Sequence, residues 1–341
     1  MTYEEAEEKI LNGMKILIRE GSAARNLDNL KELYKKYSSE LMLCSDDLHP
    51  EMLVKGHINR LVGKLISEGY DVFDVIKSAT LNPMLHYNMN VGVLRVGDSA
   101  DFIVVDSLEK MDVVETWIEG SKVFGDGKVN FSANSAPELN NFNCNAISPL
   151  EIKVLVESPE VKVIESFDGE LFTKNLTVPV RETSELGSNT KNDILKIVVK
   201  DRYNDSPPSV GFIKGFGLQN GAFASSIAHD SHNIICVGVS DEDIVTAINT
   251  VVEMRGGLVV CNQNRVSKIN LEIGGIMTSS SCFETAEKYL KLNDELRVMG
   301  CTFKAPFMTL SFMALLVIPE LKISDKGLFD VNSFSITKLF V

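Results

Sequence analysis

Two adjacent carboxylates, Asp46 and Asp47, are the part of the sequence best suited to chemistry. They follow a short apolar run, residues 41–44, and precede a helical pattern that begins near Pro50. In a (β/α) barrel, catalytic residues lie at the carboxyl ends of the strands. A carboxylate there can ligate a divalent metal ion and accept a proton from metal-bound water. The alternative is that either Asp caps the helix predicted over residues 51–68, because Asp is a favourable N-cap.

Two further groups of polar side chains adjoin predicted strands. Glu20 and Ser22 end the strand before Asp46 and therefore belong to the same face of a barrel. Their alternative is a turn in which Ser22 caps the next helix. His229, Asp230 and His232 precede an apolar strand, and so dense a group of titratable side chains indicates a second site. A structural hydrogen-bonding cluster at the start of the strand is the alternative.

Alternating helices and strands in the first part of the chain predict parallel βα units. The predicted helices cover residues 4–11, 27–37, 51–68 and 72–79, and the predicted strands cover residues 14–18 and 41–44. Two parallel strands cannot bury both of their faces. We therefore expect this region to be the end of a larger α/β fold.

The pattern changes after residue 88, where turn signals alternate with short β-rich runs that predict antiparallel hairpins. Residues 131–147 are rich in Asn, Ser and Ala, which predicts a linker. A separate α/β domain is predicted over residues 148–341. Its predicted strands cover residues 194–199, 234–239 and 258–261, and its predicted helices cover residues 241–255 and 282–299.

Composition narrows the class of protein. The 341 residues are enough for two or three domains, and the net charge of −13 argues against a nucleic-acid-binding surface. The longest apolar stretch, residues 307–319, is shorter than a membrane span, so no membrane partner is expected. The six cysteines are scattered without a C-x-x-C pair, and the acidic N-terminus has no signal-peptide pattern. These features predict a cytoplasmic protein with reduced thiols.

Several motifs together resemble a known family. Thr80-Leu81-Asn82-Pro83, followed by Gly92-x-Leu94-x-Val96-Gly97-x-x-Ala100-Asp101-Phe102-Ile103-Val104-Val105-Asp106, is similar to the C-terminal signature of the amidohydrolase superfamily. In that superfamily the signature marks the exit from a metal-dependent barrel into a small β-sandwich. Residues 19–26, 44–47, 229–233 and 307–312 narrow the resemblance to bacterial adenine deaminases.

The resemblance implies an α/β fold class: the C-terminal remnant of a (β/α)8 amidohydrolase barrel over residues 1–88, a β-sandwich segment over residues 89–130, and the adenine deaminase-type α/β domain. It implies metal-dependent hydrolysis of adenine, a purine base, to hypoxanthine and ammonia, with Mn or Fe as the divalent metal. By resemblance, Asp46 would be a metal ligand and proton shuttle. Asp47 would bind a ring nitrogen or the exocyclic group of the base.

The sequence also departs from this family. The family holds its metals with a His-x-His on the first strand, a Glu, two further His and an Asp on the last strand, and only Asp46 is matched here. None of the five histidines forms a His-x-His on a strand. A complete barrel takes about 250 residues. We therefore expect an inactive isolated chain that is a homo-oligomer or complements a separate N-terminal half. The alternative is a non-catalytic fragment or subunit that serves assembly.

Overall fold

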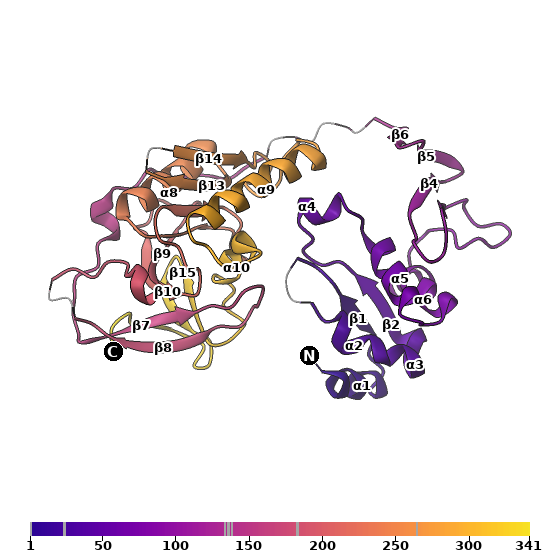
Figure 1. Cartoon of the computed structure of the whole chain (residues 1–341), viewed down its shortest axis with the longest axis horizontal. Helices are drawn as coiled ribbons and strands as arrows, with labels where there is room; N and C mark the ends of the chain where they lie inside the picture. The colour runs from indigo at the N-terminus through magenta and orange to yellow at the C-terminus, as the bar shows by residue number, and fades with distance from the viewer. Residues whose placement is uncertain are drawn as a thin grey trace. The chain divides into compact units, whose positions relative to one another are not determined.

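The computed structural model describes residues 2–22, 25–132, 134, 137, 139–181, 184–263 and 265–341 (Figure 1). The chain divides into two compact units, Met1–Asn134 and Ser135–Val341, which are described separately below. Four residues of the expected linker (Ala133, Ser135, Ala136 and Glu138) and two of the motif at 19–26 (Ala23 and Ala24) lie outside the described residues.

The first unit begins with a parallel pair of strands surrounded by helices. Its elements are α1 (Tyr3–Leu11), β1 (Ile16–Arg19), α2 (Leu27–Leu30), the 3-10 turn η1 (Lys31–Leu33), α3 (Tyr34–Tyr37), the 3-10 turn η2 (Ser38–Glu40), β2 (Leu41–Cys44), α4 (Pro50–Leu53), α5 (Ile58–Ser67), α6 (Val72–Ala79) and α7 (Leu81–Tyr87). The register pairs Ile16 with Leu41 and Arg19 with Cys44. Both strands therefore end at the same edge, as the sequence predicts.

The two longer predicted helices are broken, and each break has a local cause. Leu27, Leu30 and Leu33 are buried at intervals of three residues, a spacing that matches the three-residue turn of a 3-10 helix, so residues 27–37 alternate between the two helix types. The helix predicted over residues 51–68 stops at Leu53 and restarts at Ile58. Gly56 lies between them with φ +137°, a backbone conformation that an α-helix cannot contain.

One face of the β1–β2 pair is covered by an apolar core. Ile16 and Ile18 on β1 pack with Leu41 and Leu43 on β2, and α5 contributes Leu61, Val62 and Leu65 to the same cluster. Leu17, which alternates with the buried residues of β1, is 44% exposed. The opposite face of β1 is therefore less well covered, as expected for a pair of parallel strands without further neighbours.

An antiparallel sheet follows in the first unit. It contains β3 (Phe102–Val105), β4 (Val113–Ile118), β5 (Ser121–Gly125) and β6 (Lys128–Val129) in that order, so each strand pairs with the next along the chain (Figure 1). The Phe102 and Trp117 rings stack with centroids 5.6 Å apart across β3 and β4. The predicted hairpins are confirmed, while the β-sandwich stays a prediction, because the described strands form a single sheet.

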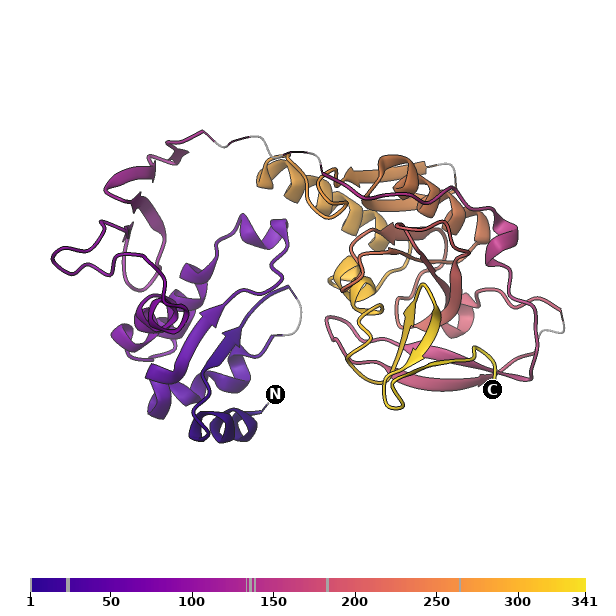
Figure 2. The same ribbon diagram turned by 180° about the vertical axis from the view of Figure 1, so that it is seen from behind.

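The second unit is built on an eight-stranded, mostly antiparallel sheet. Its strand order is β14-β13-β11-β12-β9-β10-β7-β8, where β7 (Glu160–Glu165), β8 (Lys174–Pro179), β9 (Ile194–Lys200), β10 (Ser209–Lys214), β11 (Ala222–Ser225), β12 (Ile234–Gly238), β13 (Gly257–Asn262) and β14 (Arg265–Asn270) are the strands. Among the described strands of this sheet, only β7 and β10 pair in parallel. A smaller sheet of β15 (Leu321–Ser324), β16 (Gly327–Asp330) and β17 (Ser335–Thr337) packs against β10 and is drawn in yellow in Figure 2.

Helices cover both faces of this large sheet. Ala224 on β11 packs into the cluster formed with α8 (Asp241–Met254). Phe223, the next residue, points to the other face, where its ring contacts Phe307 of α10 (Pro306–Phe312) at 5.1 Å between centroids. The long helix α9 (Cys282–Val298) packs along β13 and β14. The strands and helices predicted for residues 194–299 are confirmed with small shifts at their ends.

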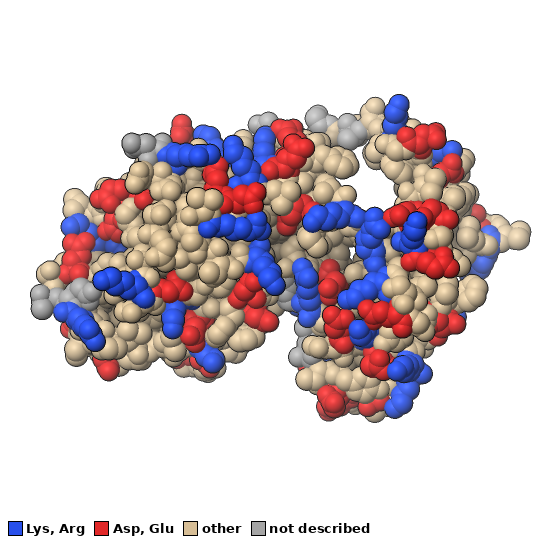
Figure 3. Space-filling view, in the orientation of Figure 1, with Lys and Arg blue, Asp and Glu red and all other residues tan. Residues whose placement is uncertain are grey.

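Two surface properties bear on the predicted partners. On the face shown in Figure 3, acidic and basic side chains are interspersed rather than gathered by sign. Within the described parts of the chain, no helix is long and apolar enough to cross a membrane.

Candidate functional site

Asp46 lies in the loop directly after β2 and contacts the end of β1. Its Oδ2 accepts a 2.9 Å hydrogen bond from Nη1 of Arg19, the last residue of β1. Its Oδ1 accepts the backbone N–H of Asp47 at 2.8 Å. The backbone of Asp46 has φ 49°, a left-handed conformation that Asp adopts more readily than most residues. This turn directs the carboxylate back over β1.

The surroundings of Asp46 keep its carboxyl group ionised. Burial on its own would raise the pKa of Asp46, but the hydrogen bonds from Arg19 and from the backbone of Asp47, together with the Arg19 charge, outweigh burial and lower that pKa below its ordinary value. The same carboxylate raises the pKa of the neighbouring Cys44 thiol, second to the effect of burial. Asp46 is therefore held in its ionised form, which is the form that attracts a cation or accepts a proton.

Helix capping does not account for Asp46 or Asp47. The N-cap of α4 is His49, and Pro50 occupies the first helical position, where the missing N–H is not needed. Asp46 and Asp47 precede this cap in the connecting loop. Their N-cap alternative is therefore wrong for α4, and it is wrong for α5 as well, whose N-cap is His57.

Glu20 and Ser22 join the loop after β1 to the loop after β2. The backbone N–H of Glu20 donates to the Cys44 carbonyl at 3.2 Å, and that of Ser22 donates to the Asp47 carbonyl at 2.9 Å. The Ser22 hydroxyl accepts the backbone N–H of His49 at 3.0 Å. Ser22 therefore does not cap the next helix, whose N-cap is Asn26. Burial raises the pKa of Glu20, and the positive charge of Arg25 opposes that rise.

A small cavity adjoins these loops. It has a volume of about 130 Å³, and its lining includes Glu20, Arg25, Ser45, Met52, His57 and Arg60. The Ser45 hydroxyl and His57 Nε2 are hydrogen-bonded at 2.8 Å. The sequence pattern placed His57 inside a helix, but the break at Gly56 puts it at the start of α5, beside the cavity. Arg19 and Ser45 belong to the sequence motifs at 19–26 and 44–47, but neither was predicted to be a site residue, although both flank predicted strand ends.

The described residues do not form a metal site on their own. No three side chains of His, Cys, Asp or Glu within the described ranges lie close enough to hold a metal ion together. Three protein ligands are usual for a catalytic zinc ion and serve as a guide for other divalent metals. Asp46, the expected ligand, is instead bound to Arg19. These residues therefore do not fit the metal that the resemblance implies.

His229, Asp230 and His232 form a cluster in the second unit. The His229 ring stacks on Phe312 with centroids 4.9 Å apart and lies 5.7 Å from the His232 ring. His229 Nδ1 is 3.4 Å from Asp230 Oδ1. Burial lowers the pKa of His232, and the nearby positive charges of His229 and Arg202 lower it further. The three side chains therefore form a cluster at the start of β12, as the sequence predicts.

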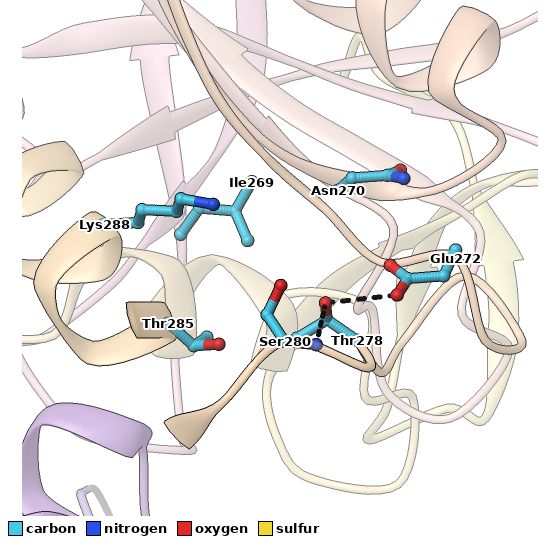
Figure 4. A pocket seen from close by; sticks show the side chains of 7 residues that line it. All are labelled: Ile269, Asn270, Glu272, Thr278, Ser280, Thr285 and Lys288. Carbon is cyan, nitrogen blue, oxygen red and sulfur yellow. Dashed lines mark hydrogen bonds between the residues drawn. The ribbon is translucent and has the colours of Figure 1, made fainter. Parts of the chain in front are cut away.

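Another pocket in the second unit was not anticipated from the sequence. It has a volume of about 290 Å³ and is lined by Ile269, Asn270, Glu272, Thr278, Ser280, Thr285 and Lys288 (Figure 4). Glu272 accepts hydrogen bonds from the backbone and hydroxyl of Ser279 and from the Thr278 hydroxyl. The bonds from Ser279 hold the pKa of Glu272 at about 2, well below its ordinary value. These hydrogen bonds tie Glu272 to residues 278 and 279, in the segment that lines the pocket.

Each of the two units matches a known family model. Residues 3–128, in the first unit, match the family model described as amidohydrolase family. Residues 170–335 match the model described as the adenine deaminase C-terminal domain. Together with the similarity of nearly the whole chain to curated adenine deaminases, these matches confirm the resemblance seen in the sequence motifs.

Curated relatives share this similarity along nearly the whole chain. The chain is 50% identical to the adenine deaminase of Methanosarcina barkeri, 48% to that of Methanosarcina acetivorans and 44% to that of Borreliella burgdorferi, over 98–99% of its own length. It spans only 62–64% of the length of these relatives. A solved β-aspartyl dipeptidase from Fervidobacterium islandicum aligns with 39% of each chain at 20% identity and a TM-score of 0.33, too low a likeness to support a conclusion.

Proposed function

We propose that this chain contributes Asp46 and its neighbours to the hydrolytic deamination of adenine to hypoxanthine and ammonia. The observation that carries this proposal is the 50% identity to the adenine deaminase of Methanosarcina barkeri over 99% of the chain. The position of Asp46 after β2 supports it, because barrels of this kind carry their catalytic residues at the carboxyl ends of strands.

The proposed roles follow from the charges and contacts of the two carboxylates. Asp46 accepts a proton from the water whose oxygen bonds to C6 of adenine, and returns it to the exocyclic nitrogen as the C6–N bond breaks and ammonia leaves. Asp47 binds a ring nitrogen or the exocyclic amino group. Glu20 and Ser22 border the site, because their backbones are bonded to the loop that carries both Asp residues. The divalent metal, Mn or Fe, stays a prediction from the family resemblance.

The fold assignment behind these roles is part of the proposal. Residues 1–88 would be the last βα units of an amidohydrolase barrel, and residues 89–130 would be its β-sandwich segment. Residues 131–147 would link these to the C-terminal domain, residues 148–341. A cytoplasmic location and assembly as a homo-oligomer or with a separate N-terminal half complete this proposal.

The isolated chain would be inactive, since its described residues offer Asp46 but no group of three potential metal ligands. The second candidate function is that of a non-catalytic fragment or subunit. The lack of three potential metal ligands among the described residues favours it for the chain alone. The test is ammonia release from adenine with Mn²⁺ or Fe²⁺, by the purified chain and by a chimera that adds the segment of the Methanosarcina barkeri enzyme that this chain does not match.

We expect turnover only from the chimera. Ammonia release by the chain alone, at rates typical of enzymes of about 1 s⁻¹ or more, would contradict its inactivity. A folded chimera that fails to deaminate adenine would favour the non-catalytic candidate.

A further inference from the structure

A buried arginine in the second unit has no carboxylate partner. Arg202, two residues after β9, is 5% exposed. Its Nη2 donates a 2.9 Å hydrogen bond to the Tyr203 hydroxyl, but Nε and Nη1 are buried without a partner. No ion pair involves this guanidinium in the described part of the chain. Because arginine stays protonated, a buried charge with unmet donors is unfavourable.

Aromatic rings and a glycine shape the space around Arg202. The guanidinium carbon lies 5.4 Å from the centre of the Phe142 ring and 4.8 Å from that of Tyr203. A Cβ at Gly275 would lie 2.0 Å from Nη1, so only glycine allows the guanidinium to approach the backbone there. The rings stabilise the cation through their faces, but they do not accept the N–H bonds at its edge.

A second unpaired nitrogen belongs to the same end of the sheet. Strand β9 pairs with β12 so that Lys200 lies opposite Ile234, which places Arg202 beside the segment before β12. In that segment, Nδ1 of His232 is buried without a partner. Asn233 accepts the backbone N–H of Arg202 at 3.2 Å, and Tyr203 donates to the Ser231 carbonyl at 2.7 Å. These bonds hold the His232 loop against the arginine.

We propose that Arg202 and His232 form a binding site for a small oxyanion, a carboxylate or a phosphate. The oxygens of the oxyanion would accept hydrogen bonds from the unpartnered N–H groups of Arg202. They would also accept one from His232 when its Nδ1 carries the proton. Asp230 is 79% exposed and lies beside His229, and Asp201, next to Arg202 in the chain, accepts hydrogen bonds from Tyr203 and Asn204. Neither carboxylate forms an ion pair with Arg202 in the described part of the chain. The site lies in the second unit and goes beyond the proposed chemistry of Asp46.

Calorimetric unfolding of the 341-residue chain tests this site with inorganic phosphate and, separately, with acetate, against sodium chloride at equal ionic strength. When the oxyanion is present at about a hundred times its Kd, it should raise the Tm of the second unit by roughly 5–10 °C. Arg202→Met should remove this response while its Tm without oxyanion stays at or above that of the unchanged chain, because an unpaired charge is removed. Arg265→Met, at an arginine 72% exposed and paired with Glu295, is the matched control and should respond normally.

The two anions distinguish the source of the oxyanion, since a response to phosphate alone indicates a phosphate ligand and one to acetate alone a carboxylate ligand. No response to either, or an Arg202→Met chain that responds like the unchanged one, would overturn the proposal. If Arg202→Met does not fold, His232→Gln tests the same site. It should raise the Kd of the active probe about tenfold, as expected for a lost hydrogen bond, and an unchanged Kd would equally overturn the proposal.

Discussion

Arg19 and Asp46 join the ends of two adjacent parallel strands through a 2.9 Å hydrogen bond between Nη1 and Oδ2. The register pairs Arg19 with Cys44, so the loop after β2 must fold back for Asp46 to reach β1. The left-handed backbone of Asp46 provides this turn. Since Arg19 occupies one carboxylate oxygen, a cation bound by Asp46 would have to share the carboxylate with it or displace it.

Replacing Arg19 tests how the Asp46 carboxylate is kept ionised. Arg19→Met removes both a hydrogen bond and a positive charge, so the pKa of Asp46 should rise, since burial then acts with less opposition. Carboxyl-carbon NMR titration measures this change. In the unchanged chain the lowered pKa adds stability above the unfolded pKa of Asp, and this stability is lost as pH falls through the folded pKa. Arg25→Met, which removes the neighbour of Glu20, is the control and should leave Asp46 unchanged.

Glu20 should show the opposite dependence on pH. Burial raises its pKa, so the folded unit binds a proton more readily than the unfolded chain does. The stability of the first unit should therefore fall as pH rises through the unfolded pKa toward the folded one. Glu20→Gln should raise the free energy of unfolding at pH 7 and have little effect at pH 3, as measured by urea unfolding. A loss of stability at pH 7 would show that the Glu20 charge has a stabilising partner.

A buried lysine gives a prediction for the second unit. Lys322 is fully buried, its Nζ donates to the carbonyls of Leu171 and Phe312, and burial lowers its pKa to about 7. Between pH 7 and 10.5 the unfolded chain therefore binds more protons than the folded chain does. The free energy of unfolding of the unit should rise over that range, and Lys322 should contribute on the order of 4 kcal/mol to the rise.

Lys322→Met should lack this rise, which is measured as the difference between the urea unfolding curves of the two proteins at pH 7 and pH 10. The control is Lys326→Met, because Lys326 is exposed and paired with Asp325. An equal pH dependence in the Lys322 variant and the unchanged chain would mean that Lys322 stays charged in its buried position.

The sequence predicted which segments meet at the candidate site, but not how they bond. Parallel strands that alternate with helices have to end at one edge, so Glu20, Ser22 and the two Asp residues could be grouped from the pattern alone. The Arg19–Asp46 bond depends on the backbone angle of a single loop residue, which no periodicity reports. His57 was misplaced because the apolar helical period continues across Gly56, whose positive φ interrupts the helix.

The second unit shows the same limit over longer distances. His229 and His232 were visible as a cluster because they lie within four residues of each other. Arg202 was not, since it reaches them only through the pairing of β9 with β12. Local patterns therefore identified one half of the proposed oxyanion site, and the strand order was needed for the other half.

Asp46 and Asp47 should have separate roles in the chimera that supplies the unmatched segment of the Methanosarcina barkeri enzyme. Asp46→Asn removes the negative charge and the proton acceptor, so kcat should fall by roughly 10²–10⁴-fold. Asp47→Asn keeps a hydrogen-bonding side chain of the same size, so it should act through the substrate and raise KM about tenfold, the effect of one weakened hydrogen bond. Steady-state kinetics with adenine and the metal content of each variant are the measurements.

Metal content distinguishes a ligand from a residue that only orders the loop. We expect Asp46→Asn to lose bound metal and Asp47→Asn to retain it, because only Asp46 is placed as a ligand by the family resemblance. Arg19→Met is the control, because it breaks the ion pair but leaves the Asp46 carboxylate in place. This variant should keep its metal. If only Asp46→Asn loses metal, the loss cannot come from breaking the ion pair. A fully active Asp46→Asn chimera with normal metal content would show that the carboxylate serves only the Arg19 contact, and the proposed proton transfer would have to be assigned to another residue.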